Sequence, residues 1–118
     1  MSGRILPNSN VIEVRQGDSF AIKLHIKRND ENVDLSGAEL KMQARDNKDR
    51  VVLDILGESI NVVEGKMAIL ITPENSNIEI GDYNCDIQLK TSDGSINTIF
   101  PANVNQIGIL RITKQVTR

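Results

Sequence analysis

The strongest constraint on the fold of this chain is an alternating stretch at residues 80–90. Tyr83, Cys85, Ile87 and Leu89 alternate there with polar residues. A strict two-residue period is typical of a β-strand that buries one face. The stretch is therefore predicted to be the central strand of the protein.

A turn follows this strand directly. Asp93-Gly94 supplies the positive φ that a tight reversal needs, and a second extended run occupies residues 96–101. The two runs together predict a β-hairpin.

The rest of the chain repeats the same kind of pattern. Short apolar or alternating runs, separated by polar turns, occupy residues 11–15, 20–27, 40–45, 51–55, 59–63, 67–72 and 107–114. Gly57 is expected to break the fourth of these runs, Glu64-Gly65 to turn a hairpin, and residues 102–106 to form a loop. Residues 73–77, after a Thr72 cap, carry the one helix signal. This spacing predicts an all-β antiparallel sandwich of about eight or nine strands.

Length indicates a single domain. A chain of 118 residues can bury one core, and its aromatic content of 3% means that branched aliphatic side chains must build it. Residues 1–10 hold Gly, Pro, Ser and Asn and are interpreted as an N-terminal arm. Residues 11–118 are interpreted as the β-sandwich domain.

Charge and hydropathy narrow the class of partner. The formal net charge is -2, with both signs interspersed, so no attraction to nucleic acid or to an anionic membrane is expected. No apolar run is long enough to cross a bilayer, and residues 1–7 lack the apolar segment of a secretory signal. We therefore expect synthesis and retention in the cytosol.

Reactive side chains are few. His25 is the sole histidine and Cys85 the sole cysteine, so a thiol–imidazole pair would need both, and an internal disulfide is impossible. Strand parity opposes the pair, because Cys85 falls on a core face while His25 falls opposite the apolar face of its strand. We expect a buried, inert thiol and a surface imidazole. A zinc site would need more Cys or His ligands.

Acidic residues cluster in three places: Asp30, Glu31 and Asp34; Asp46 and Asp49; and Asp82, Asp86 and Asp93. None has the ligand spacing of a calcium loop, and solvated turns explain them better, although loops of a sandwich can pool calcium ligands from distant positions. A facing carboxylate pair could also serve glycoside hydrolysis, but the sequence gives no distance between such groups.

Sugar binding by stacking would require exposed aromatic rings. Phe20 and Tyr83 lie on predicted core faces, which leaves only Phe100 in question. The same shortage removes the aromatic platforms of single-strand nucleic-acid binding. No catalytic, cofactor-binding or metal-binding residue is assigned.

Five motifs occur in one order along the chain: residues 16–20 (QGDSF), 33–45 (VDLSGA leading to MQAR), 81–88 (GDYNCDIQ), 93–99 (DGSINTI) and 116–118 (VTR). This order, from about residue 14 to the end, resembles small virion structural proteins of tailed bacteriophages. Those proteins carry immunoglobulin-like sandwiches similar to the N-terminal domain of the phage baseplate upper protein. Residues 100–106 depart from the resemblance, because such proteins commonly have a Gly-containing turn shortly before the last strand.

The resemblance implies a structural or adaptor subunit of a phage particle, in the tail, baseplate or head-tail region. It implies an immunoglobulin-like sandwich that packs against other virion proteins and against copies of itself, with no cofactor and with the virion as its location. A second hypothesis keeps the fold but makes the chain a module that binds a host-surface glycan or protein, with calcium as a possible aid. An enzyme is the third and least supported class.

Overall fold

The computed structural model describes residues 4–5, 10–101 and 106–114. Within them lie twelve strands, three of which have only two residues. The strands are β1 (Arg4–Ile5), β2 (Val11–Arg15), β3 (Phe20–His25), β4 (Lys27–Arg28), β5 (Glu31–Asn32), β6 (Glu39–Arg45), β7 (Val51–Leu56), β8 (Glu58–Asn61), β9 (Lys66–Ile71), β10 (Gly81–Lys90), β11 (Ile96–Phe100) and β12 (Ile109–Thr113). A 3-10 turn (Val62–Glu64) and helix α1 (Pro73–Ser76) complete the described elements.

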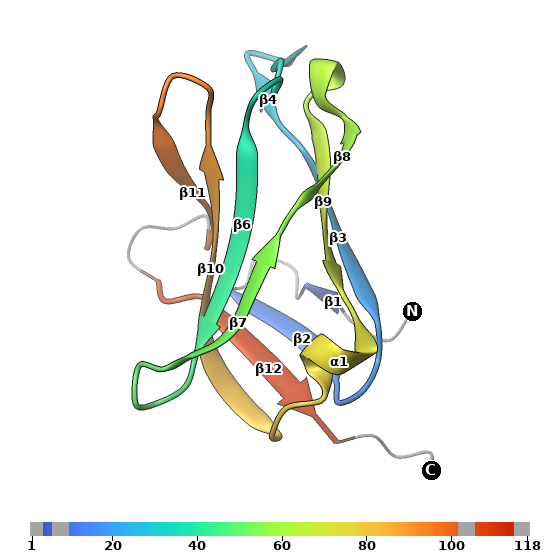
Figure 1. Cartoon of the computed structure of the whole chain (residues 1–118), viewed down its shortest axis with the longest axis vertical. Helices are drawn as coiled ribbons and strands as arrows, with labels where there is room; N and C mark the ends of the chain where they lie inside the picture. Colours follow the sequence, from blue (N-terminus) through green and yellow to red (C-terminus); the bar gives the residue numbers. More distant parts are fainter. Residues whose placement is uncertain (1–3, 6–9, 102–105, 115–118) are drawn as a thin grey trace.

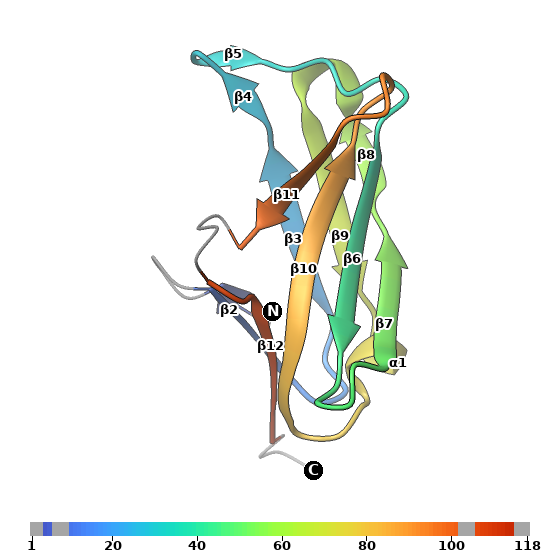
Figure 2. The same ribbon diagram turned by 90° about the vertical axis from the view of Figure 1, so that its left-hand side faces the viewer.

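The strands form two facing sheets and a small hairpin of β4 and β5 (Figures 1 and 2). The larger sheet has the order β1-β2-β12-β10-β6-β7, and β11 also pairs with β10. The smaller sheet has the order β3-β9-β8. Buried aliphatic side chains from both sheets make one core. This nearly all-β architecture is compatible with the predicted immunoglobulin-like sandwich.

β10 confirms the predicted central strand. Its alternate residues Ile87 and Leu89 are buried, and β6 pairs with it along residues 84–90. The opposite edge of β10 is divided between two strands, since β12 pairs with residues 81–84 and β11 with residues 87–90. The chain must therefore leave this edge after β11 and return to it at β12.

The predicted hairpin of β10 and β11 is also confirmed. Its turn is closed by the Thr91 amide, which donates to the Ser95 carbonyl at 2.9 Å. Gly94 has φ 89°, the left-handed conformation that glycine adopts without strain. The pairing contains a bulge next to Ile87, where Ile87 lies opposite Phe100 and the next residue lies opposite Thr98.

The predicted Thr72 cap agrees with the structure, and a second local feature lies at Leu35. The Thr72 hydroxyl caps α1 by accepting from the Asn75 amide at 3.2 Å. In return, the Thr72 amide donates to the Asn75 Oδ1 atom at 2.9 Å. Leu35 is 2% exposed, and Gly37 follows it with φ 77°, so the chain buries a leucine under a loop and then turns. Both features come from residues close in sequence.

Three expectations need correction. The strands are antiparallel at every described pairing except that of β2 with β12, which is parallel. A parallel pair needs a long connection, and these two strands have the whole domain between them. The strand number exceeds the predicted range because β1, β4 and β5 are two-residue pairings that no periodicity reveals. The last strand begins at Ile109 rather than at residue 107.

Gly57 separates β7 from β8, in agreement with the predicted break. The chain passes there from β7 in the larger sheet to β8 in the smaller one, as Figure 1 shows. The Gly57 amide donates to the Leu40 carbonyl at 2.6 Å, and a Cβ atom on Gly57 would lie 2.7 Å from the Leu40 Cβ. Glycine is needed because the two backbones meet closely.

The proposed arm and the predicted loop lie largely outside the described residues. Of residues 1–10, the structure describes the β1 pair, which is bonded to β2, and Asn10. Of residues 102–106, it describes Gln106. The role of the arm therefore stays a prediction.

Candidate functional site

His25 and Cys85 lie in different sheets, on β3 and β10. His25 is exposed, and its Nε2 atom lies 2.7 Å from the Asn32 Oδ1 atom. Cys85 is 4% exposed and faces the core. The faces predicted for both side chains are confirmed, and the structure does not bring the thiol and the imidazole together.

The surroundings of Cys85 keep its thiol protonated. Burial raises the pKa of the Cys85 thiol to about 12, and the nearby negative charge of Asp86 acts in the same direction. The thiolate is the nucleophilic form of cysteine. Cys85 is therefore a core side chain with an unreactive sulfur.

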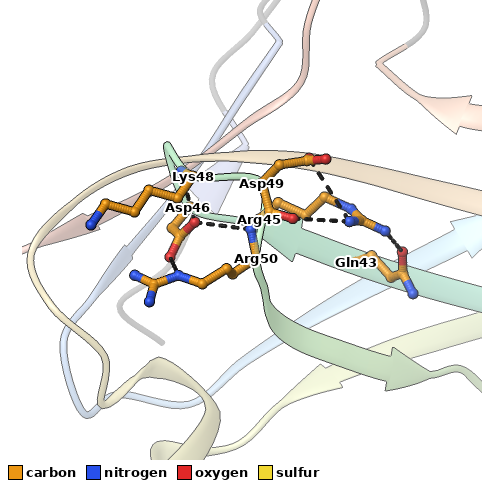
Figure 3. Close-up of polar contacts among 6 residues, drawn as sticks. All are labelled: Gln43, Arg45, Asp46, Lys48, Asp49 and Arg50. Atoms are coloured by element: carbon orange, nitrogen blue, oxygen red, sulfur yellow. Dashed lines mark hydrogen bonds and ion pairs between the residues drawn. The ribbon is translucent and has the colours of Figure 1, made fainter.

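Asp46 organises the loop between β6 and β7 (Figure 3). Its Oδ1 atom accepts from the amides of Lys48 and Arg50 at 2.9 and 3.0 Å, and Arg50 Nε donates to Oδ2 at 2.8 Å. The Arg50 amide bond, followed by the other donors, lowers the pKa of Asp46. In the same loop Arg45 Nη1 lies 3.8 Å from Asp49 Oδ1. The carboxylates of Asp46 and Asp49 therefore already have partners within this loop and at its ends.

Two other aspartates also accept hydrogen bonds within their own turns. Asp34 Oδ1 accepts from the amide and the hydroxyl of Ser36 at 2.9 and 2.6 Å. Asp93 accepts from the Thr91 hydroxyl and the Ser95 amide, and these bonds lower the pKa of Asp93 to about 2. Among the described residues, no group of three His, Cys, Asp or Glu side chains is placed to hold a metal ion.

The three aromatic side chains are turned inward or engaged. Phe20 and Phe100 are 8% and 9% exposed. Tyr83 is half-buried, and its hydroxyl donates to the Glu79 carbonyl at 2.5 Å. Phe100, the ring in question for sugar binding, is thus part of the core, and the chain offers no exposed aromatic platform.

A hollow of about 440 Å³ lies at the divided edge of β10, where β11 ends and β12 has not yet begun. Its lining includes Gln43, Arg45, Asn84, Asp86, Thr98 and Ile107. The alternation of β6 and β10 places the polar members on the outer face of the larger sheet. Sequence periodicity predicts that these side chains point outward, but only the strand order reveals the hollow beside them.

Polar groups in this hollow could hold a hydroxylated or charged small molecule. Arg45 Nη2 donates to Gln43 Oε1 at 3.4 Å, which orients both groups. Asp86 is half-buried, and its carboxylate has no hydrogen-bond or ion-pair partner within the part of the chain that the structure describes. Among the described residues, the hollow therefore combines the Arg45 cation, the Asp86 carboxylate and several neutral polar groups.

Comparison with known proteins gives a fold and no family. No known family profile matches this chain. No curated protein sequence matches it either. The N-terminal domain of ORF48 of phage TP901-1 is similar, with a TM-score of 0.51 and 15% identity over 93% of this chain and 90% of that chain. The fold is thus shared with a phage protein's N-terminal domain.

A second solved structure also aligns. Murine CRIg has a TM-score of 0.40 and 12% identity over 91% of this chain and 93% of that chain. Within the described residues, no helix is long and apolar enough to span a membrane.

Proposed function

We propose that this chain is a structural or adaptor subunit of a tailed-phage particle, in the tail, baseplate or head-tail region. The observation that carries the proposal is the shared fold with the N-terminal domain of a phage protein, which extends over nearly the full length of both chains. The ordered sequence motifs, which do not depend on the structure, indicate the same class of protein.

The proposed mechanism is packing of surfaces rather than chemistry. The one thiol is buried, and the carboxylates of the loops accept bonds from their own turns. Large apolar side chains are nevertheless exposed along the strand edges, including Leu56 and Ile60. Exposed apolar side chains at edges suit association with other virion proteins and with copies of this chain. We propose a non-enzymatic subunit without a cofactor.

Detection in purified particles tests this role. Phage particles are purified from cells that produce this chain and are treated with nuclease. An antibody raised against the purified chain should recognise a component of these intact particles. The signal should co-sediment with the particles after washing in high salt. Presence of the chain in the cleared lysate together with its absence from particles would overturn the proposal.

The arm has its own test. A variant that lacks residues 1–10 should keep the cooperative unfolding of the full chain but enter particles poorly. Equal incorporation of the shortened and full chains would remove the arm from the assembly mechanism.

The hollow at the divided edge favours a second candidate, a module that binds a host-surface glycan or protein. The Asp86 carboxylate and the nearby amides of the hollow are suitable partners for sugar hydroxyls. A glycan panel, screened with calcium and with chelator, tests this function. Binding that Asp86→Asn abolishes and that the matched change Asp54→Asn preserves would support it, and no binding in either condition would remove it.

A further inference from the structure

The smaller sheet has two strands that no described strand covers on one side. Its order is β3-β9-β8, so β3 and β8 are its edges and lie on opposite sides of β9. An uncovered edge is a surface on which another chain can pack. The question is which surface of which partner fits each edge.

The two edge strands carry opposite charge. β3 holds Lys23 and no acidic residue, and β8 holds Glu58 and no basic residue. Asp54 lies nearby in β7 of the larger sheet, and Glu64 lies in the 3-10 turn after β8. Lys27 and Arg28 lie in the β4–β5 hairpin, where Glu31 is opposite Arg28. Lys23 thus makes the β3 edge basic, and Glu58 makes the β8 edge acidic.

Lys23 and Glu58 differ from Asp54 and Glu64 in having no ion pair within the described part of the chain. Asp54 lies 3.7 Å from Lys41 Nζ, and Glu64 lies 3.3 Å from Lys66 Nζ. The side chains of Glu58 and Lys23 are exposed and have no hydrogen-bond or ion-pair partner among the described residues. They are therefore available for a contact between molecules.

The register places these two charges at one level of the sheet. Ala68 of β9 lies opposite Lys23 on one side and opposite Glu58 on the other. A second copy can lie with its β3 edge against β8 of the first and with no shift along the strands. Its Lys23 would then lie next to Glu58 of the first copy.

Apolar side chains accompany the acidic edge. Leu56, Ile60 and Val63 are 60%, 54% and 64% exposed. Burying such side chains in a contact is favourable by about 25 cal/mol for each Å² removed from water. This apolar area supplies attraction, while the charges select the orientation.

We propose that the acidic edge of one copy docks on the basic β3 edge of a second copy, head to tail. A two-fold contact of β8 with β8, or of β3 with β3, would bring like charges together, which disfavours it. A head-to-tail contact leaves one edge free on each end, so it builds a ring or a filament. β8 has a bulge between Ser59 and Asn61 in its pairing with β9, and this irregular backbone suits a contact through side chains better than a further backbone ladder.

This inference rests on the proposed structural role for its setting, but self-association can be measured on the purified full chain. Sedimentation velocity across a concentration range should show reversible growth that added salt weakens. Glu58→Lys and Lys23→Glu should each weaken association at least tenfold. An equimolar mixture of the two variants should regain it, because each contact between one variant and the other joins a lysine to a glutamate.

Glu39→Lys, an exposed change on the larger sheet, is the matched control and should associate like the original chain. Circular dichroism must show that all variants are folded. A monomer at every concentration, or variants that associate like the original chain, would overturn the inference. A monomer that is still found in particles overturns only this contact, whereas a self-associating chain that is absent from particles overturns only the proposed function.

Discussion

Arg111 of β12 forms a two-pronged ion pair with Asp82 of β10. Arg111 Nε donates to Asp82 Oδ1 at 2.9 Å, and Nη2 donates to Oδ2 at 3.3 Å. The pair joins the last described strand to the first part of the central strand, where the two strands lie opposite each other. The hydrogen bond to Asp82, followed by its charge, raises the pKa of the Arg111 guanidinium.

A double-mutant cycle with Asp82→Asn and Arg111→Gln should give a small coupling energy. The side chains are about half exposed, so solvent screens the pair and the coupling in the free energy of urea unfolding should be close to the limit of measurement. The coupling should shrink in 1 M salt, where charges are screened over about 3 Å. A coupling that salt leaves unchanged would mean that packing, rather than charge, joins the two residues.

Gly57→Ala should destabilise the sandwich by about 1–3 kcal/mol, because the new methyl group has no room. It would lie 2.7 Å from Leu40 Cβ and 2.9 Å from Leu40 Cδ2, and Leu40 is buried. Urea unfolding at neutral pH measures the loss. The same substitution should cost less in a Leu40→Ala background, since the Cγ and Cδ2 contacts are then gone. Equal costs in the two backgrounds would mean that the Leu40 Cβ atom alone makes the clash. A Gly57→Ala variant as stable as the original chain would contradict a steric cause.

Sequence periodicity predicts much of this fold because burial alternates along a strand. The inward faces of β6 and β10, including Met42 and Ile87, follow directly from the pattern. The turn at Gly94 and the cap at Thr72 follow from local chemistry. The passage from one sheet to the other at Gly57 does not, because it depends on how closely a distant strand approaches.

The surfaces of interest were harder to predict. Parity alone places Cys85 inside and His25 outside. The hollow beside Asp86 exists because β11 and β12 share one edge of β10, and pairing between strands distant in sequence leaves no local signal. Lys23 and Glu58 likewise lie at the same height along the strands because both are opposite Ala68 of β9. This depends on two strand registers that leave no local signal.

Asp93 should make folding sensitive to acid. Its carboxylate accepts from Thr91 and Ser95, and these bonds lower its pKa from 3.8 to about 2. As the pH falls, Asp93 therefore binds a proton at a higher pH in the unfolded chain than in the folded chain. The stabilisation is present above about pH 4 and is lost as the pH falls towards 2.

An NMR titration of the Asp93 carboxyl carbon tests this relation. Thr91→Val removes the hydroxyl donor, so the pKa of Asp93 should move back towards 3.8. The difference in urea midpoint between Asp93→Asn and the original chain should also narrow from pH 5 to pH 2. An Asp93 pKa that is the same with and without the Thr91 hydroxyl would contradict the assignment.

Cys85 should make folding sensitive to alkali. Burial raises the pKa of its thiol from 9.0 to about 12, so above pH 9 the unfolded chain loses a proton that the folded chain keeps. The stabilisation is complete below pH 9 and declines as the pH rises towards 12. Other groups titrate in this range, so the reference is Cys85→Ala, whose urea midpoint should fall less between pH 8 and pH 10.5. Parallel pH profiles for the two proteins would mean that the thiol is more accessible than its 4% exposure implies.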